Sequence, residues 1–567
     1  MHIFKKLIPV EEAQRILISY AREVKECEEV DIDNALGRVV AEDIYAGIDI
    51  PSFDRATRDG YAVIAEDTYA ASERTPIKLQ LRGYIKTGSY PKNILTHGEA
   101  FRIDTGASLP RGANAIVPIE YTSEENGYVI IFRRVSPWAN IQWAGADIAR
   151  GEIIVQRGTI ITPRHIGALA GIGYPRIKVR RKPKVAVFSI GDELISVDSK
   201  LTPGKIYDIN IHTLTSLIRK SGGEPVVLGI AKDSTESILK KLKEGLEVAD
   251  IIISSGGSSV GQSDFIRAAV EELGAEILFH GVMSKPGKPV LGSRIGDKLY
   301  IGLPGNPASA ILSFILYVKP VISKMLGIKP THRTPGGLVL KRREYGVKGR
   351  RLYKTIAIKR RNSDYVYESL PASSESISTL SKADAYFIIP EDTEFIDSGI
   401  AVNLSFFDAQ PQLAGIFIVG EYSPSILRSI ISIIGDKYLV RYIRRDYEAT
   451  LLAVEEEVAD IAIFTKEVKN SIRLTRKIAL AGDASRGDIV TAMRNIEGER
   501  IIVVGSHQSA ILRYLNGLAE AVIAPKELLD LYGVEEYRII GQEPLYIYAS
   551  RDLSEIIRNV LKNLSNL

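Results

Sequence analysis

The sequence is poor in cysteine, with one residue, Cys27, among 567, and it has only two tryptophans. A single cysteine excludes an internal disulfide bond and a metal cluster built on several thiolates. Cys27 is therefore interpreted as a small apolar residue of the core. The composition is otherwise that of a globular protein, with 45% hydrophobic and 25% charged residues.

The sequence also lacks an excess of either charge, because 73 lysines and arginines face 69 aspartates and glutamates. This balance does not favour nucleic acid or an anionic membrane surface as a partner. No apolar run reaches the roughly 18 residues that a membrane span needs, and the longest candidate, residues 308–318, stops at Lys319 and Pro320. The first residues lack the apolar stretch of a secretion signal. We therefore expect a cytoplasmic protein.

A chain of 567 residues is too long for a single hydrophobic core. About three to five domains are expected, and the patterns predict a multidomain protein of α/β and β parts. The expected divisions are elongated N-terminal linker and β regions at 1–180, an α/β domain with a parallel sheet at 181–327, a small β domain at 328–408 and a further α/β domain at 409–567.

The N-terminal region opens with an amphipathic pattern that predicts a helix at residues 11–24, followed by short strands separated by glycine and proline. Two loops in this region carry more charge than a surface loop needs. Residues 51–63, PSFDRATRDGYAV, include Asp59, and residues 102–117, RIDTGASLPRGANAIV, place Thr105 on a turn. A solvated loop and a ligand-binding loop both remain open at this point.

In residues 181–327 apolar strands alternate with helical patterns, which predicts a parallel sheet with crossover helices. The expected strands are residues 185–190, 226–230, 251–255 and 299–303, and the expected helices are residues 211–221, 235–247, 264–273 and 308–326. Ligands of such sheets bind at the carboxyl ends of the strands, which is where the polar residues of this region gather.

Gly-rich turns follow the third and fourth of these strands. Glycine lets the backbone approach a ligand closely, and the free N–H groups of a helix start bind anions. Lys285 and Lys288 add positive charge, while Glu193, Asp233 and Asp264 each follow a different strand and suit a divalent metal. We predict a phosphate and metal site at this edge, with a solvated surface as the alternative. The turn residues are Gly256, Gly257, Ser258, Pro304, Gly305, Asn306, Pro307 and Ser309.

Residues 409–567 show a second alternation of strands and helices. Ser423 precedes Pro424 after one apolar strand, and Ser506 follows another, so each serine has the position of a helix cap. The alternative interpretation is an oxyanion or pterin site, formed by the serine hydroxyls and two helix starts at one sheet edge. His507 is interpreted as a polar loop residue and not as a ligand.

Eight motifs occur in one order over roughly residues 1–408 and resemble those of the molybdopterin molybdenumtransferase family, which includes the E domain of gephyrin. They are FDRATRDGYAV, RIDTGASLPRGANAIV, VAVFSIGDEL, GKIYDIN, LGIAKD, SGGSSVGQSDF, KPGKP and GLPGNPAS. The resemblance implies a homodimer whose cleft joins the α/β domain of one subunit to the N-terminal region of the other. It also implies that molybdate or tungstate is inserted into adenylylated molybdopterin, with Mg²⁺-dependent release of AMP.

The resemblance also implies roles for individual residues. The implied catalytic residues are Asp59, Thr105, Glu193, Asp233, Asp264 and Lys285, and the implied metal ligands among them are Glu193, Asp233 and Asp264. The implied substrate-binding residues are Lys288 and the eight turn residues named above. The molybdopterin adenylyltransferase is a further candidate partner. Residues 409–567 are similar to the periplasmic-binding-protein-like extension of some archaeal and bacterial family members.

The sequence departs from the family pattern at five positions. Ala56 and Arg58 stand where the family usually has Ser and Met, Gln142 and Ala146 where it usually has Arg and Glu, and Gly281 where a basic residue is common. These positions cluster on the substrate side of the implied cleft. One alternative function is therefore a catalytically altered paralog that senses an oxyanion or pterin or acts as a scaffold. Another is molybdopterin adenylylation, although that reaction needs only the α/β domain.

Overall fold

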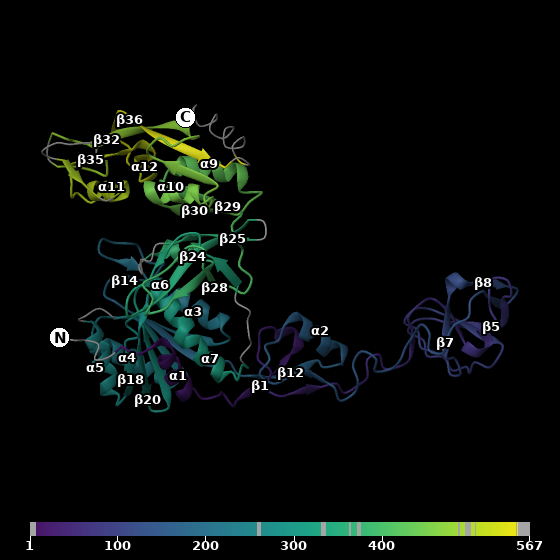
Figure 1. The fold of residues 1–567 in the computed structure, drawn as a ribbon. Coiled ribbons are helices and arrows are strands. Elements are labelled where there is room, and N and C mark those ends of the chain that lie inside the picture. The colour runs from purple at the N-terminus through teal and green to yellow at the C-terminus, as the bar shows by residue number, and fades with distance from the viewer. Residues whose placement is uncertain are drawn as a thin grey trace.

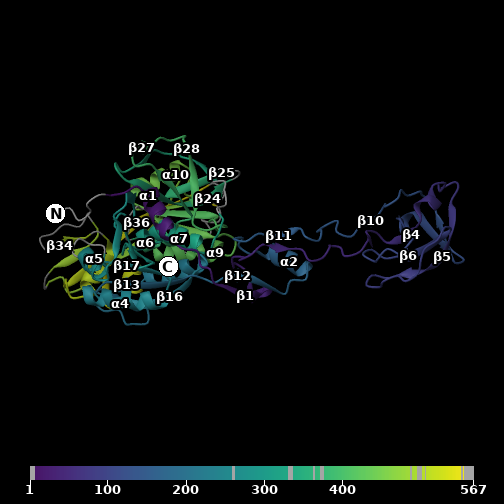
Figure 2. The ribbon, with the colours of Figure 1, turned by 90° about the horizontal axis from the view of Figure 1, so that it is seen from below.

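The computed structural model describes residues 7–257, 262–329, 336–361, 364–370, 376–485, 488–493, 501–504, 506–550 and 553. Within these residues the chain forms a body of several sheets and a long arm (Figure 1). The arm is built from the N-terminal region, and a second view also shows its tip far from the body (Figure 2). Helix α1 (Val10–Tyr20) precedes the arm and packs on the body, where Val10, Ala13 and Leu17 are buried.

The near part of the arm consists of short two-stranded pairings with one helix against them. Its elements are β1 (Cys27–Asp31), paired with β12 (Arg176–Arg180), β2 (Ile44–Tyr45), paired with β11 (Ile153–Val155), and α2 (Pro163–Gly171). Cys27 is exposed, so its interpretation as a core residue is wrong. A two-stranded ribbon leaves much of both faces in water. Consistent with this, four of the five residues of β1 are exposed.

The tip of the arm is a six-stranded sheet with the order β7-β4-β6-β5-β9-β8. Its strands are β4 (Gly60–Val63), β5 (Ile77–Ile85), β6 (Glu99–Ile103), β7 (Ala115–Pro118), β8 (Thr122–Glu125) and β9 (Tyr128–Ile131). This sheet confirms the short strands that the glycine and proline spacing predicts. A further short pairing joins β3 (Arg55–Ala56) to β10 (Ile141–Gln142).

The body contains a six-stranded central sheet with the order β16-β13-β17-β21-β20-β18. Its strands and helices are β13 (Lys184–Ile190), α3 (Asn210–Lys220), β16 (Glu224–Ala231), α4 (Thr235–Val248), β17 (Ile251–Gly256), α5 (Gln262–Glu272), β18 (Glu276–His280), β20 (Leu291–Ile295), β21 (Lys298–Leu303) and α6 (Pro307–Ser313). The four expected strands are parallel, as predicted, but β20 and β18 are antiparallel additions that make the sheet mixed. The missed signal is Gly296-Asp297, a two-residue hairpin turn between β20 and β21.

The central strands are apolar throughout because both faces of the sheet are covered. In β13, Val185 and Val187 belong to one core, while Ala186 and Phe188 belong to the other. Helices α1 and α3 contribute to the first core, and α4 and α5 contribute to the second. Burial on both sides fixes where each strand ends, and so it positions the loops that follow.

One continuous helix, Pro307–Met325, lies along the first core. Its middle, Phe314–Val318, is π-helical and is followed by α7 (Lys319–Met325). The helix predicted at residues 308–326 is confirmed, and it continues past Pro320 because the wider π-helical turn before it accommodates a residue without an N–H group. By length and composition this helix is apolar enough to cross a membrane, but 67% of its apolar window is buried inside the protein, which is typical of a core helix.

The small β region contains a sheet with the order β19-β24-β26-β28-β22, and β25 pairs with β24. Its elements are β19 (Ser284–Lys285), β22 (Gly336–Val339), β24 (Arg351–Arg361), β25 (Asp364–Ser369), α8 (Ile377–Lys382), β26 (Ala385–Ile389) and β28 (Ala401–Phe406). Strand β19 comes from the loop of the predicted lysines, and Lys285 pairs with Leu352 of β24. The lysine loop is thus attached to this sheet.

The C-terminal region contains an eight-stranded sheet with the order β30-β29-β31-β36-β32-β35-β33-β34. Its elements are β29 (Ile416–Gly420), α9 (Pro424–Ile434), β30 (Val440–Arg444), α10 (Tyr447–Glu455), β31 (Ile461–Phe464), β32 (Ile472–Gly482), β33 (Ile489–Thr491), β34 (Ile501–Val503), α11 (His507–Leu515), β35 (Ala521–Pro525), α12 (Lys526–Leu531) and β36 (Tyr537–Ala549). We call β29, β30 and β31 with α9 and α10 the first half, and β33, β34 and β35 with α11 and α12 the second half. The long strands β32 and β36 join the two halves.

The strands of the two halves point toward each other. Strand β31 pairs with Tyr546–Ala549 of β36 and runs toward the second half. Strand β35 pairs with Ile478–Gly482 of β32 and runs toward the first half. The other strands of each half are parallel to these, so α9 and α11 begin at facing edges. The prediction of two helix starts at one sheet edge is corrected accordingly.

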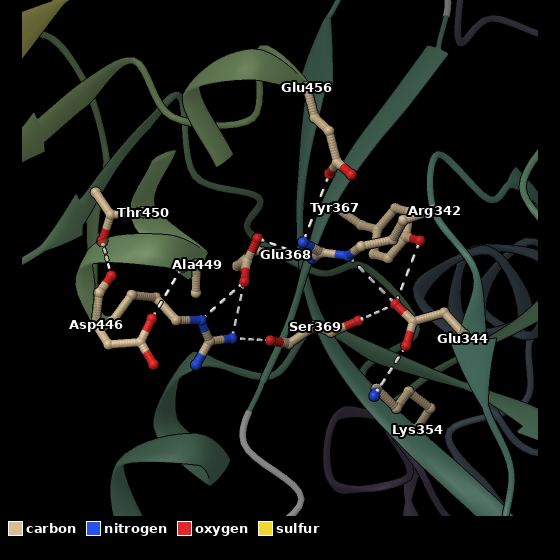
Figure 3. Close-up of polar contacts among 11 residues, drawn as sticks. Arg342, Glu344, Lys354, Tyr367, Glu368, Ser369, Asp446, Ala449, Thr450 and Glu456 are labelled. Carbon is tan, nitrogen blue, oxygen red and sulfur yellow. Dashed lines mark hydrogen bonds and ion pairs between the residues drawn. The ribbon is translucent and has the colours of Figure 1, made fainter. Parts of the chain in front are cut away.

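Buried ion pairs join the first half to the small β region (Figure 3). Nη2 of Arg342 lies 3.0 Å from Glu368, and Nη1 lies 3.6 Å from Glu456, which follows α10. Glu368 also lies 2.8 Å from Arg445 of the first half. Burial raises the pKa of Glu456, against the opposing effect of Arg342. Separating buried partners would leave unpaired charges, so this contact fixes the orientation of the two parts.

Candidate active site

Two loops at the carboxyl edge of the central sheet are tied together by their aspartates. Asp192 follows β13 and Asp233 follows β16. The N–H of Asp192 donates to Oδ2 of Asp233 at 3.2 Å, and the N–H of Asp233 donates to Oδ1 of Asp192 at 3.4 Å. The neighbouring Glu193 is exposed, and a Cβ atom on Gly191 would lie 2.7 Å from its Oε2. Gly191 therefore leaves the space that Glu193 occupies, and Asp192 joins the predicted acids.

The two Gly-rich turns touch each other through their backbones. Gly256 has a φ of +101°, and a Cβ atom there would lie 2.2 Å from the carbonyl oxygen of Ile190. A Cβ atom on Gly305 would lie 3.2 Å from Cα of Gly256. Only glycine fits at Gly256, because any side chain meets backbone that cannot move aside. These glycines permit a close approach between the two turns, while the predicted approach to a ligand stays a prediction.

Asn210, at the start of α3, links the two Gly-rich turns through its side chain. Its Nδ2 donates to Oγ of Ser255 at 2.6 Å and to the carbonyl oxygen of Gly305 at 2.5 Å. Ser255 in turn donates to the carbonyl oxygen of Pro304 at 3.1 Å. All three hydrogen bonds hold the last two strand ends in one arrangement. Asn210 lies in the motif GKIYDIN, which signals its importance, but the residue types alone assigned it no role.

Asp208, two residues before Asn210, is almost fully buried, with 2% of its surface exposed. Its Oδ1 accepts hydrogen bonds from Ser189 Oγ at 2.9 Å and from the N–H of Ile211 at 3.1 Å. Its Oδ2 is buried and has no hydrogen-bond partner. An unpartnered carboxylate oxygen beneath this edge favours a cation or a hydrogen-bond donor as a ligand.

The three predicted metal ligands are not gathered into one group. Glu193 and Asp233 belong to the tied loops, whereas Asp264 lies at the start of α5, close enough to His280 to affect its pKa. The pKa of His280 is lowered mainly by burial and then by the positive charge of Arg267, while Asp264 opposes the shift. In the described ranges no three His, Cys, Asp or Glu side chains lie close enough together to hold a metal ion. The carboxylates still suit Mg²⁺, which takes one or two of them together with phosphate oxygens of a substrate.

The lysine loop packs against α6 beside the last Gly-rich turn. Gly287 has a φ of +98°, and a Cβ atom there would lie 2.9 Å from Oγ of Ser313 in α6. Lys285 and Lys288 flank this glycine and are half-buried. The structure therefore places the two predicted cations on the same side of the site as the turn after β21.

The predicted turn residues differ in exposure. Asn306 is exposed, Gly305 and Pro307 are half-buried, and Pro304 and Ser309 are buried. Gly256 and Gly257 are buried as well. Ser258 lies outside the described residues. The accessible part of the predicted cradle is thus the backbone from Gly305 to Pro307.

Asp59 and Thr105 meet at the tip of the arm, as their pairing in one predicted site requires. The N–H of Thr105 donates to Oδ1 of Asp59 at 2.7 Å, and its hydroxyl donates to the same oxygen at 2.9 Å. These hydrogen bonds hold the pKa of Asp59 below its usual value. Strands β4 and β6, which lie next to these two residues in the sequence, are far from β13, which ends three residues before Glu193 (Figure 2).

The departures from the family pattern have local structural partners. Gln142 accepts a hydrogen bond from Nε of Arg55 at 3.0 Å, so an arginine on the paired strand lies beside the position where an arginine is usual. Ala56 is buried and bonds through its backbone to Ala107. Gly281 has a φ of +98°, a conformation that a basic side chain rarely adopts. Arg58 and Ala146 are exposed.

Two hollows lie near the central sheet. The larger, of about 230 Å³, is lined by Tyr20, Asp250 and Leu299 at the amino ends of the strands, away from the Gly-rich turns. The smaller, of about 20 Å³, is lined by Gly256 and His280 at the carboxyl edge. Ligands of such sheets bind at the carboxyl edge, so size alone does not locate the site.

Two protein families and several known proteins match the sequence of this chain. The family described as "MoeA N-terminal region (domain I and II)" matches residues 8–173, and the family described as "Probable molybdopterin binding domain" matches residues 186–324. Molybdopterin molybdenumtransferase from Bacillus subtilis is 34% identical over 402 residues, which cover 70% of this chain and 93% of that protein. The chain belongs to the molybdopterin molybdenumtransferase family.

Other relatives in this family show the same correspondence. Molybdopterin molybdenumtransferase from Nostoc is 36% identical over 307 residues, which cover 54% of this chain and 70% of that protein. A solved structure of the molybdopterin biosynthesis MoeA protein from Pyrococcus horikoshii has a TM-score of 0.62 and 32% sequence identity. The match covers 71% of this chain and 100% of that protein. The chain is therefore an enzyme of molybdenum cofactor biosynthesis with a mixed, multidomain α/β fold.

Proposed function

We propose that this family member inserts molybdate or tungstate into adenylylated molybdopterin, with Mg²⁺-dependent release of AMP. The observation that carries the proposal is the contact between the turns of Gly256 and Gly305, next to the loop of Lys285 and Lys288. A pyrophosphate needs backbone N–H donors and positive charge at close range. The backbone N–H groups of Gly305 and Asn306, in the accessible turn, and the two lysines would supply both.

The tied acidic loops complete the site on the other side of the glycine turns. Magnesium would be held by carboxylates of Asp192, Glu193 or Asp233 together with the pyrophosphate oxygens, and Asp264 would approach from the start of α5. A bound magnesium ion would offset the negative charge that develops on the phosphates. The hydrogen bonds between Asp192 and Asp233 hold both loops so that they can receive it without rearrangement.

The reaction divides into capture and hydrolysis. The two thiol groups of the pterin form two bonds to the metal and give their protons to one oxygen of the oxyanion, which leaves as water. A second water molecule then cleaves the phosphoanhydride bond, so that one phosphate leaves as AMP and the other stays on the pterin. Lys285 and Lys288 bind and orient the phosphates in this scheme. The backbone from Gly305 to Pro307 approaches them most closely, because it is the accessible part of the cradle.

The same proposal assigns the arm to a second subunit. Asp59 and Thr105 are paired with each other beside strands of the arm's tip, and the tip lies far from β13 of the central sheet in the same chain (Figure 2). A homodimer would bring the arm of one subunit to the central sheet of the other. The molybdopterin adenylyltransferase, which makes the substrate, is a further proposed partner. A cytoplasmic location accompanies this role.

A second candidate function is a catalytically altered paralog that binds the pterin without completing the reaction. Gln142 favours it, because it replaces the arginine that the family pattern usually has, and the neighbouring Arg55 is engaged in a hydrogen bond to Gln142. Retention of Glu193, Asp233 and Lys285 favours the active enzyme.

One experiment separates the two functions. The full chain is incubated with adenylylated molybdopterin, Mg²⁺ and either molybdate or tungstate, and AMP is measured. Metal-dependent AMP release supports the enzyme, and its absence with intact substrate binding supports the altered paralog. Glu236→Gln, a change at an exposed acid on α4, serves as the matched control for Glu193→Gln.

A further inference from the structure

The facing helix starts of the C-terminal region are not equivalent. Ser423 precedes α9, but its side chain does not cap that helix. Its Oγ donates to both carboxylate oxygens of Glu527 at 3.0 and 3.1 Å, and the N–H of Ser425 donates to Glu527 at 3.2 Å. Glu527 lies in α12, in the second half. The start of α9 therefore already holds an anion, supplied by the other half of the same sheet.

Ser506 has the simpler role that its sequence position predicts. Its Oγ accepts a hydrogen bond from the N–H of Ser509 at 3.1 Å, which is a helix cap for α11. Because Ser423 bonds to Glu527 and Ser506 caps its own helix, both hydroxyls are engaged within the chain. The predicted oxyanion site built on these two serines is not formed.

Arg476, in the middle of β32 where the two halves meet, instead has a side-chain nitrogen without a hydrogen-bond partner. The residue is 8% exposed. Nε lies 2.6 Å and Nη2 lies 2.5 Å from the same carboxylate oxygen of Glu543, on the neighbouring strand β36. Nη1 is buried and has no hydrogen-bond partner. A buried, charged N–H group without a partner is costly, so its retention points to a ligand.

Two more buried polar atoms without partners lie at the start of α11. They are Nδ1 of His507 and Oε1 of Gln508. Burial first, and the positive charges of Arg476 and Arg444 after it, together lower the pKa of His507 to about 4, so both arginines lie near this ring. At neutral pH the histidine is therefore uncharged, in surroundings that favour a negative group.

We propose that Arg476, His507 and Gln508, called here the Arg476 cluster, bind a small anion that also carries a hydrogen-bond donor. The anionic group would take Nη1 of Arg476, and the donor would take the carboxamide oxygen of Gln508. A bare oxyanion satisfies only the first of these. A pterin with an acidic substituent has both features, and the family to which this chain belongs is named for such a pterin.

All three residues of the Arg476 cluster belong to the described part of the chain. His507 is corrected from a polar loop residue to the first residue of α11, with a buried ring nitrogen. Glu543 holds Arg476 from one side, so the guanidinium is oriented before a ligand arrives. A ligand bound there would contact the second half through α11 and the joining strands through β32.

The test uses the full chain and pterin-6-carboxylate as the probe, with binding followed by calorimetry and by pterin fluorescence. Arg476→Met and Gln508→Met should each weaken binding by about tenfold or more, since each removes one buried partner. Gln508→Met leaves the Arg476–Glu543 pair in place, so it remains informative if Arg476→Met does not fold. Arg473→Met is the matched control, because Arg473 lies on β32 but is exposed on the other face.

Three further probes decide the chemistry. Unsubstituted pterin should bind more weakly than pterin-6-carboxylate, and molybdate and phosphate should bind more weakly still. The proposal is overturned if pterin-6-carboxylate binds equally well to the wild type and to both cluster variants. It is also overturned if molybdate binds as well as the pterin and Gln508→Met has no effect on either. No turnover is involved, so these results do not depend on whether the chain releases AMP.

Discussion

Asp192 and Asp233 each accept a hydrogen bond from the backbone N–H of the other, at 3.2 and 3.4 Å. The loops after two neighbouring strands are therefore held by the same carboxylates that the proposed reaction would use for magnesium. Asp192 and Asp233 would therefore have a structural role in the loops and a chemical role toward magnesium. A change from aspartate to asparagine separates these roles, because it removes the charge of the side chain and keeps its shape.

Asp233→Asn keeps an oxygen for the loop contact but removes the negative charge. We expect AMP release to fall by about 100-fold at a fixed Mg²⁺ concentration, and the Mg²⁺ concentration for half-maximal rate to rise, because one ligand of a divalent ion is weakened. Asp198→Asn, at an exposed position after β14 (Leu194–Ile195), is the control and should leave both quantities unchanged. A rate loss with no change in Mg²⁺ dependence would assign Asp233 a purely structural role.

Gly256→Ala should destabilise the body of the protein. The new Cβ atom would lie 2.2 Å from the carbonyl oxygen of Ile190, and the φ of +101° is itself unfavourable for alanine. We expect a loss of at least about 3 kcal/mol in unfolding free energy, measured by thermal unfolding. Gly274→Ala is the matched control, because Gly274 has a φ of +68° with open space around it and should cost only about 1 kcal/mol. Equal losses would show that the contact with Ile190 is not important.

Lys285→Met should weaken nucleotide binding, because the proposed role of Lys285 is to offset phosphate charge. We expect the dissociation constant for an adenosine nucleotide to rise by about tenfold, and added salt to weaken the wild type in the same direction. Lys243→Met, at an exposed position on α4, controls for the loss of one positive charge. Unchanged affinity in Lys285→Met would place the lysine outside the phosphate site.

A mixture of two inactive variants tests the proposed homodimer. Asp59→Asn and Glu193→Gln affect opposite sides of the proposed cleft. The strands next to them in the sequence, β4 and β13, lie far apart in one chain (Figure 2). Mixed dimers would contain one intact cleft, so part of the AMP release should return when the two proteins are combined. Light scattering at micromolar concentration provides the independent measurement, and a monomer there would contradict the arrangement.

The buried His507 should make stability depend on pH. Its pKa is lowered from 6.5 to about 4, first by burial and then by Arg476 and Arg444. The unfolded state therefore binds a proton at a pH where the folded state does not, so the stabilisation is complete above pH 6.5 and is lost as the pH falls through about 4. The full effect is about 3 kcal/mol.

Calorimetry of His507→Asn between pH 7.5 and pH 4.5 gives the measurement. The variant should lose less stability on acidification than the wild type does. His212→Asn, at an exposed position on α3, should behave like the wild type. A wild type and a His507→Asn variant with identical acid profiles would show that the ring is not held uncharged.

Much of the central sheet could be predicted because its signals are local. The apolar run Ile251–Ile253 indicates a strand covered on both faces because its residues are β-branched, and Gly256 indicates the turn that follows. The antiparallel strands β18 and β20 were not predicted, because their mixed residues carry no clear period. The short turn at Gly296-Asp297 was the one sequence signal that could have indicated β20, and it was missed.

The site was predicted in its residue types but not in its arrangement. Glu193, Asp233 and Asp264 follow different strands, yet the described structure does not unite them, since loop conformation depends on contacts that no single segment encodes. The same limit applies to Ser423. Its position before Pro424 predicts a cap, but Glu527, distant in sequence, takes the hydroxyl.

Strand β24 belongs to more than one part of the protein at once. At Leu352 it pairs with Lys285 of the lysine loop, and at Lys359 it forms an ion pair with Asp460, which precedes β31 of the C-terminal sheet. From Leu352 to Lys359 the strand extends for about 23 Å without a flexible joint. One stiff segment of backbone therefore connects the C-terminal sheet to Lys285, the lysine that we propose binds phosphate. A truncation after residue 408 would remove the ion pair that holds one end of β24, the strand whose other end pairs with Lys285. We therefore expect the C-terminal sheet to stabilise the position of Lys285.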